Sequence, residues 1–218
     1  MIKNQEFANL QVFCDKERRV AKKVYEFLYK GFKTPNTNIL CNQFGAMANI
    51  CGIMEGLNAD TKRNLNTLFN AVSSPPFFLR KYDDGWTSIL HSVFCATNIA
   101  SYALQYSQNT REQYVVALAY DNEQFLCAAF QDGEILFNYN AHNESKEHII
   151  PDASEIATFA EKIGCRKEDV LRLIDAVHDQ KAAVASHIFK HPVIDSAERI
   201  KPAERSLYIE VSGEGLWY

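Results

Sequence analysis

The chain has 218 residues, of which 47% are hydrophobic and 23% are charged, and its formal net charge is −4 at neutral pH. This composition is ordinary for a soluble globular protein and argues against a disordered chain. Residues 1–35 hold eight Lys or Arg against four Asp or Glu, whereas residues 111–218 hold eleven against nineteen. The acidic second half disfavours nucleic acid as a partner and favours a basic protein, although surplus carboxylates can also serve solubility alone.

The N-terminal residues and the cysteines indicate the compartment. Polar residues follow Met1 where a signal peptide needs an apolar core, and no apolar run reaches membrane-spanning length. The six cysteines occur singly, and the shortest spacing, from Cys41 to Cys51, is too long for a zinc-binding Cys-x-x-Cys pair. We therefore expect a cytoplasmic protein that has reduced, structural thiols and no contact with a membrane.

Helical spacing of apolar residues dominates the first third of the chain. From Glu6 to Lys30, apolar residues recur every three or four positions, which predicts an amphipathic helix with a basic outer face. A polar break at residues 35–38 precedes a second predicted helix that runs to about Glu55. Asp60 begins a short third helix through Val72, and the prolines that follow end it.

A short strand and a long helix are predicted next. Phe77 to Leu79 has the length of a short strand, and a helix is predicted from Trp86 to about Tyr106. Asp83 and Asp84 precede this helix, where a negative charge meets unpaired backbone N–H groups. Paired carboxylates can also bind a divalent cation, but their position favours capping.

Residues 114–140 read as a three-stranded antiparallel meander. Its apolar runs are Tyr114–Tyr120, Phe125–Phe130 and Ile135–Asn140, and the second polar link contains an Asp-Gly pair, which is typical of tight hairpins. The first two runs are apolar at nearly every position, so both faces of this sheet must be covered. We predict that the meander is the centre of the sheet and that it buries Val116, Leu118, Leu126, Ala128 and Phe137.

The C-terminal third adds two helices and a strand. The helices are predicted from Ala153 to Ile163 and from Lys167 to about Phe189, and the strand from Arg205 to Val211 joins the sheet of the meander. The chain is therefore predicted to be one helix-rich α+β domain with helices on both faces of a central antiparallel sheet. It comprises a helical part at about 5–107, the sheet at about 112–140, and the last helices and strand at about 152–212.

Catalytic and metal-binding signatures are weak. Nucleotide-binding and hydrolase fingerprints are missing from the sequence. His187 and His191 have the spacing of metal ligands but lack a third ligand, so we predict no metal and no cofactor. Cys41 near a helix start, or His178 oriented by Asp175, would be the best candidates for a catalytic group.

These features favour a non-enzymatic, cytoplasmic protein-binding module. No motif in the chain belongs to a family that we recognise. An acidic body without catalytic signature is the general profile of a bacterial immunity protein, a toxin antagonist that occludes the active site of its cognate toxin. The alternative is an enzyme, a thiol- or His-based hydrolase or transferase, whose site is assembled from residues distant in sequence.

The candidate partner-binding residues are acidic or aromatic. Because the two turns of a meander lie at opposite ends, a compact partner should use one of them. The free C-terminal Trp-Tyr pair either folds back onto the body or anchors a partner, as interface aromatics often do. The candidates are Asp121, Glu123, Asp132, Glu134, Glu210, Glu214 and Trp217.

Overall fold

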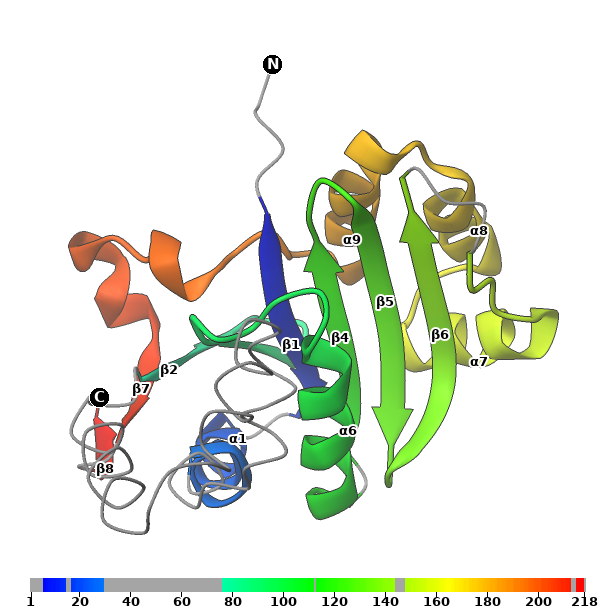
Figure 1. Cartoon of the computed structure of the whole chain (residues 1–218). Coiled ribbons are helices and arrows are strands. Elements are labelled where there is room, and N and C mark those ends of the chain that lie inside the picture. The colour runs from blue at the N-terminus through cyan, green and yellow to red at the C-terminus, as the bar shows by residue number, and fades with distance from the viewer. Residues whose placement is uncertain are drawn as a thin grey trace, which may run out of the picture.

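One antiparallel sheet joins the first and last described elements of the chain. The computed structural model describes residues 6–14, 17–29, 76–111, 113–143, 148–212 and 215–217. The spatial strand order is β6-β5-β4-β1-β3-β2-β7-β8 (Figure 1). The predicted α+β domain with an antiparallel sheet is confirmed. The strands are β1 (Phe7–Phe13), β2 (Phe77–Lys81), β3 (Trp86–Leu90), β4 (Tyr114–Tyr120), β5 (Gln124–Gln131), β6 (Glu134–His142), β7 (Ile209–Ser212) and β8 (Gly215–Trp217).

The predicted meander is formed by β4, β5 and β6, but it lies at one edge of the sheet. Asp132 and Gly133 have φ values of 54° and 84°, the left-handed conformation that an Asp-Gly hairpin turn uses. The five meander residues predicted to be core are all buried. The prediction that the meander is the centre of the sheet is wrong, because β6 is an edge strand and β1 lies in the middle.

The first predicted helix is wrong over its N-terminal half. Phe7–Phe13 is strand β1, which pairs with β3 and β4, and it is followed by α1 (Glu17–Lys23) and the π-helical turn η1 (Val24–Tyr29). The first six residues of β1 are all buried, including Asn9 and Gln11. A strand that is covered on both faces shows no alternation of polar and apolar residues, so the helical spacing of its apolar residues was coincidental.

The predicted helix that starts at Trp86 is also partly wrong. Trp86–Leu90 is strand β3, and the helix α6 (Ile99–Asn109) begins 13 residues later than Trp86. Phe77–Leu79 is strand, as predicted, within β2. Asp83 and Asp84 therefore cap no helix, because they lie in the β2–β3 turn, where Asp84 Oδ1 accepts a 3.2 Å hydrogen bond from the backbone N–H of Trp86.

The C-terminal helices match the prediction in part. Helix α7 (Ala153–Ile163) is confirmed and ends at Gly164, whose φ is 70°. The second predicted helix is divided into α8 (Lys167–Asp175), a 3₁₀ turn η3 (His178–Gln180) and α9 (Lys181–Phe189). The short 3₁₀ helices η4 (Ala197–Arg199) and η5 (Pro202–Leu207) precede β7, so the strand predicted from Arg205 begins later than predicted. β7 joins the same sheet as the meander, as predicted, and pairs with β2.

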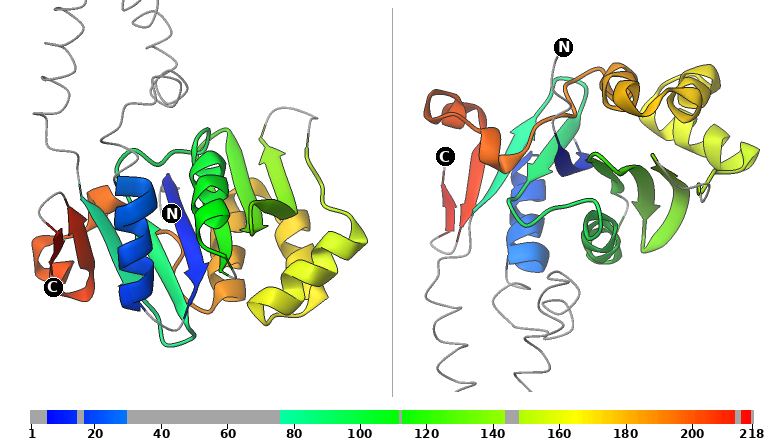
Figure 2. Two further views of the ribbon diagram at one scale, coloured as in Figure 1. Left: turned by 90° about the horizontal axis from the view of Figure 1, so that it is seen from below. Right: turned by 45° about the horizontal axis from the view of Figure 1, so that its top comes forward.

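Two apolar clusters hold the sheet and helices together. Successive residues of a strand point to opposite faces. Val115 and Ala117 of β4 belong to a cluster with α1, η1 and α6, whereas Val116 and Leu118 belong to a cluster with α7, α8 and α9. Figure 2 shows α6 and the α7–α9 group on either side of β4 and β5.

Some sequence predictions fall on other parts of the chain. The helices predicted up to Glu55 and from Asp60 to Val72, together with Cys41 and Cys51, lie outside the described residues. The described cysteines, Cys14, Cys95, Cys127 and Cys165, are free thiols. Within the described ranges, no helix has the length and apolar character needed to cross a membrane.

Candidate functional site

The residues predicted to bind a partner fall in three separate places. Asp121 and Glu123 lie at the β4–β5 turn, and Asp132 and Glu134 lie at the β5–β6 turn, at the opposite end of the meander. Glu210 of β7 pairs through its backbone with Trp217 of β8 at the far edge of the sheet. Glu214 and the side chain of Trp217 lie outside the described part of the structure.

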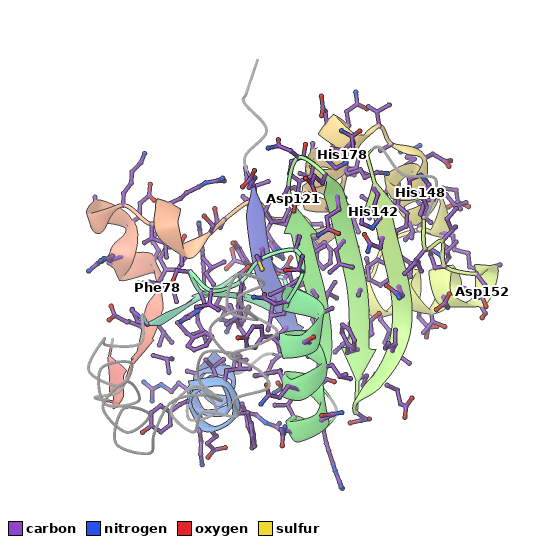
Figure 3. All side chains as sticks on the ribbon, viewed as in Figure 1. Phe78, Asp121, His142, His148, Asp152 and His178 are labelled. Carbon is purple, nitrogen blue, oxygen red and sulfur yellow. The ribbon has the colours of Figure 1, made fainter. Side chains whose placement is uncertain are left out.

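Several segments that are distant in sequence meet at the β4–β5 turn. Asn122 Nδ2 donates a 3.0 Å hydrogen bond to Glu6 Oε1, and the backbone N–H of Asn143 donates to the carbonyl oxygen of Glu123 at 2.7 Å. Nε2 of His178 lies 2.8 Å from the carbonyl oxygen of Asp121. Figure 3 shows Asp121, His142, His148 and His178 at this end of the sheet.

We call this region the acidic end, and we define it by the carboxylates that gather there. Glu6, Asp121 and Glu123 lie at this end of the sheet, and Asp175, which ends α8, and Asp179 of η3 lie there as well. The acidic end comprises Glu6, Asp121, Glu123, Asp175 and Asp179.

Asp121 has a structural role within this turn. Its Oδ1 accepts hydrogen bonds from the backbone N–H groups of Glu123 and Gln124, both at 2.8 Å, as an Asx turn does. The side chain of Glu123 is exposed. Glu123 can therefore be changed without removing a turn contact, whereas Asp121 cannot.

A pocket of about 330 Å³ opens beside the turn. Three of its lining residues are histidines, His142, His148 and His178, and Asp175 and Lys181 also line it. Two apolar side chains lie exposed at this place: Ile150 of the pocket wall is 64% exposed, and Val177, next to His178 in the chain, is 63% exposed. Exposed apolar groups beside charged ones are typical of a protein-binding surface.

Lys181 forms the buried part of this pocket. Its Nζ donates to Tyr139 Oη at 2.6 Å and to the carbonyl oxygens of Leu173 and Ile174, each at 3.0 Å. Three hydrogen bonds use all the N–H groups of an ammonium. Burial lowers the pKa of Lys181, and the charge of Asp175 opposes that shift. Lys181 thus satisfies two carbonyls in the last turn of α8, after which Ala176 and Val177 have extended backbones.

The predicted Asp175–His178 pair is not formed. The imidazole of His178 is directed to the Asp121 carbonyl and stacks on Tyr120 with ring centroids 4.7 Å apart. In the described part of the chain, no hydrogen bond joins Asp175 to His178. Both groups nevertheless line the same pocket.

His187 and His191, which have the sequence spacing of metal ligands, lie in different surroundings. His187 is exposed, whereas His191 is buried between Asp84 and Gln11. The described ranges contain no group of three His, Cys, Asp or Glu side chains placed to hold a metal ion. The catalytic candidate Cys41 lies outside those ranges.

A second pocket, of about 300 Å³, lies on the other side of the β4–β5 turn. Asp121, Tyr120 and Glu6 line it together with His91 and Ser196. The acidic turn therefore projects between two hollows, and either could receive a side chain of a partner. A hydrophobic residue next to the acidic residues of the turn would have indicated a protein-binding surface in the sequence. The exposed apolar residues, Ile150 and Val177, are instead distant from the turn in sequence.

The chain was compared with protein-family models, curated proteins and solved structures, and none of them matches it.

Proposed function

We propose that the protein is a protein-binding module whose acidic end docks a basic partner. The observation that carries this proposal is that carboxylates from the β4–β5 turn, α8, η3 and the residue before β1 lie at one end of the sheet, where Ile150 and Val177 are exposed. Long-range attraction between opposite charges speeds association, and apolar contacts slow dissociation. The acidic end offers negative charges and exposed apolar side chains within one surface.

The particular role that we propose is that of an immunity-type toxin antagonist. A toxin that acts on an anionic substrate needs a basic active site. The carboxylates of the acidic end would be complementary to such a site, and a docked module would exclude the substrate by occupying its place. The support for this role is the charge and form of the surface, together with the absence of a hydrogen bond between His178 and Asp175 within the described ranges.

The same pocket gives weaker support to the alternative of an enzyme. His178 would need a ring nitrogen placed for proton exchange and a carboxylate that orients it. Its Nε2 is held by a backbone carbonyl, and Asp175 makes no hydrogen bond to it within the described ranges. Docking requires neither, so it is the function that we propose.

Binding kinetics with two matched double variants test the docking proposal. Immobilised full-length protein first captures a partner from the native host. Association is then measured at low and high salt for wild type, for Glu123→Gln with Asp175→Asn at the acidic end, and for Asp132→Asn with Glu134→Gln at the other turn. Both double variants remove two negative charges, so they differ in position alone.

The acidic-end variant should associate more slowly and with weaker salt dependence, whereas the control should behave as wild type. Equal behaviour of the two variants would contradict the proposed surface. The toxin role has its own readout: the captured partner should carry an activity that stoichiometric amounts of the wild-type protein abolish. A captured partner whose activity is unaffected would leave docking in place and exclude antagonism.

A further inference from the structure

Three polar side chains are buried inside the sheet, away from the acidic end. Asn9 and Gln11 of β1 are fully buried, and Ser88 of β3, which pairs with Gln11, is 1% exposed. The segment 190–196, which we call the strap, passes over them between α9 and η4. Asn9 Nδ2 donates to the strap carbonyl oxygens of Val193 at 2.7 Å and Asp195 at 3.0 Å.

The direction of each hydrogen bond in this layer is fixed by its neighbours. Carbonyl oxygens accept, so the Asn9 atom that faces them is the amide nitrogen, and its Oδ1 accepts from Gln11 Nε2 at 2.7 Å. Gln11 therefore turns its Oε1 towards Ser88 Oγ at 2.8 Å and His191 Nε2 at 3.1 Å. Because an amide oxygen accepts, Nε2 of His191 must carry a hydrogen.

The other ring nitrogen of His191 also faces an acceptor. Nδ1 lies 3.0 Å from Asp84 Oδ2, and the other oxygen of this carboxyl is held by the backbone N–H of Trp86. An ionised carboxylate accepts and does not donate. A neutral His191 protonated at Nε2 would thus place a bare nitrogen lone pair against a carboxylate oxygen. The contact requires one more proton between the two atoms.

The surroundings of His191 both oppose and favour a positive charge. Burial dominates and lowers the pKa of His191 overall, although Asp84, a hydrogen bond to the backbone of Phe189 and the charge of Asp195 partly oppose that shift. Tyr82 stacks on the imidazole with ring centroids 3.9 Å apart and an interplanar angle of 11°, which favours a cation. The titratable and charged groups on the groove side are Cys165, Arg166, Asp169, His187 and Lys190. The hydrogen-bond directions decide the matter, because they leave no satisfied arrangement without the proton.

We propose that Asp84 and His191 share a proton at neutral pH and that this proton latches the strap onto the sheet. With the proton, each hydrogen bond among Asn9, Gln11, Ser88, His191 and Asp84 has a donor facing an acceptor. Without it, two acceptors 3.0 Å apart repel each other, and the strap is pushed from Gln11. This latch does not rest on the proposed docking function.

Release of the latch would reshape two surfaces. His191, Pro192 and Ile194 of the strap line a groove of about 920 Å³ beside α8 and α9. Ser196, the last residue of the strap, lines the smaller pocket beside Asp121. A change in the protonation of the Asp84–His191 pair, of which His191 is the buried member, therefore alters both hollows at once.

The test combines nitrogen NMR with two variants of adjacent residues. In Asp84→Asn, the amide Nδ2 can donate to Nδ1 of a neutral His191 while its Oδ1 still accepts from Trp86. This variant should keep the strap closed without the extra proton. Asp83→Asn, a change of the exposed neighbouring carboxylate, is the matched control. The readouts are the ¹⁵N shifts of the His191 ring and the amide signal of Val193 as pH is raised.

In wild type and in Asp83→Asn, Nδ1 of His191 should share a proton at neutral pH, and the Val193 signal should shift when that proton is lost. In Asp84→Asn, the Val193 signal should stay constant. A bare Nδ1 beside an ionised Asp84 in wild type at neutral pH would overturn the proposal, and so would the same pH response in all three proteins. If Asp84→Asn does not fold, the ring shifts of the wild type decide alone.

Discussion

Lys181 Nζ and Tyr139 Oη lie 2.6 Å apart, and this contact ties the start of α9 to the edge strand of the sheet. Tyr139 Oη in turn donates to the carbonyl oxygen of Ile174 at 2.9 Å, which Lys181 also contacts. A buried ammonium therefore closes the end of α8 with neutral oxygen atoms as its partners. The pocket at the acidic end is built on this junction.

Replacing Lys181 by Met should destabilise the protein. The change leaves the carbonyls of Leu173 and Ile174 without their buried donor, which typically costs about 1–3 kcal/mol in the free energy of unfolding. Lys162→Met on the exposed side of α7 is the control, and we expect its effect to stay within about 0.5 kcal/mol. Urea denaturation of both variants measures the difference. Equal midpoints would show that Lys181 is not the cap of α8.

One buried and one partly buried tyrosine predict how stability depends on pH. Burial raises the pKa of Tyr82 and of Tyr139 to about 12, from 10.0. A group with a raised pKa in the folded state contributes its full stability below its unfolded pKa and loses it as pH rises. The free energy of unfolding should therefore fall between pH 10 and about 12. Denaturation across this range checks the decline, and Tyr82→Phe with Tyr139→Phe should make it shallower.

The sequence was most informative where apolar residues repeat with a single clear spacing or where a turn has a characteristic residue pair. The meander was predicted from its three apolar runs and from the pair Asp132-Gly133. A tight hairpin turn needs residues with positive φ, and Asp and Gly are among the few residues that adopt it readily. β1 was mistaken for helix because both of its faces are covered, which removes the alternation that marks a strand. Buried Asn9 and Gln11 depend on strap residues 184 and 180 positions away, so no local pattern could reveal them.

The candidate site was predictable in its charge and not in its geometry. The surplus of Asp and Glu was visible, and the turn residues Asp121 and Glu123 were identified. Which carboxylates join them depends on the break between α8 and α9, where Ala176 and Val177 are extended and Lys181 binds the edge strand through Tyr139. Sequence periodicity runs through the break without a signal, which is why one helix was predicted there.

Leu118 and Leu126 test the two apolar clusters separately. Leu118 belongs to the cluster with α7–α9, and Leu126 belongs to the cluster with α6, although β4 and β5 are neighbours. Leu118→Ala and Leu126→Ala should each cost about 2–4 kcal/mol, because each leaves a cavity in a packed core. Since the two side chains face opposite sides of the sheet, the double variant should be close to additive. A large coupling energy in the denaturation data would mean that the clusters are not separate.

The thiols should react in the order of their exposure. Cys95 is exposed, whereas burial raises the pKa of Cys165 to about 11 and raises that of Cys127, which is fully buried. Because the thiolate is the reactive form, Cys95 should be labelled before Cys165, and Cys127 should wait for unfolding. Peptide mapping after brief alkylation measures this order, and denatured protein without reductant should release all six thiols. Early labelling of Cys127 would contradict the packing of β5.

Trp217 provides a contrast to the acidic end. The sequence suggested it as the anchor of a partner, but β8 is the edge strand opposite β6, whereas the acidic end lies at the tips of the meander strands. A compact partner docked at the acidic end should therefore not reach it. Trp217→Ala should leave the dissociation rate of the captured partner unchanged, whereas Val177→Asp, which places a charge among the exposed apolar groups beside His178, should speed dissociation. Faster dissociation of Trp217→Ala, with Val177→Asp behaving as wild type, would move the docking surface to the β7–β8 edge.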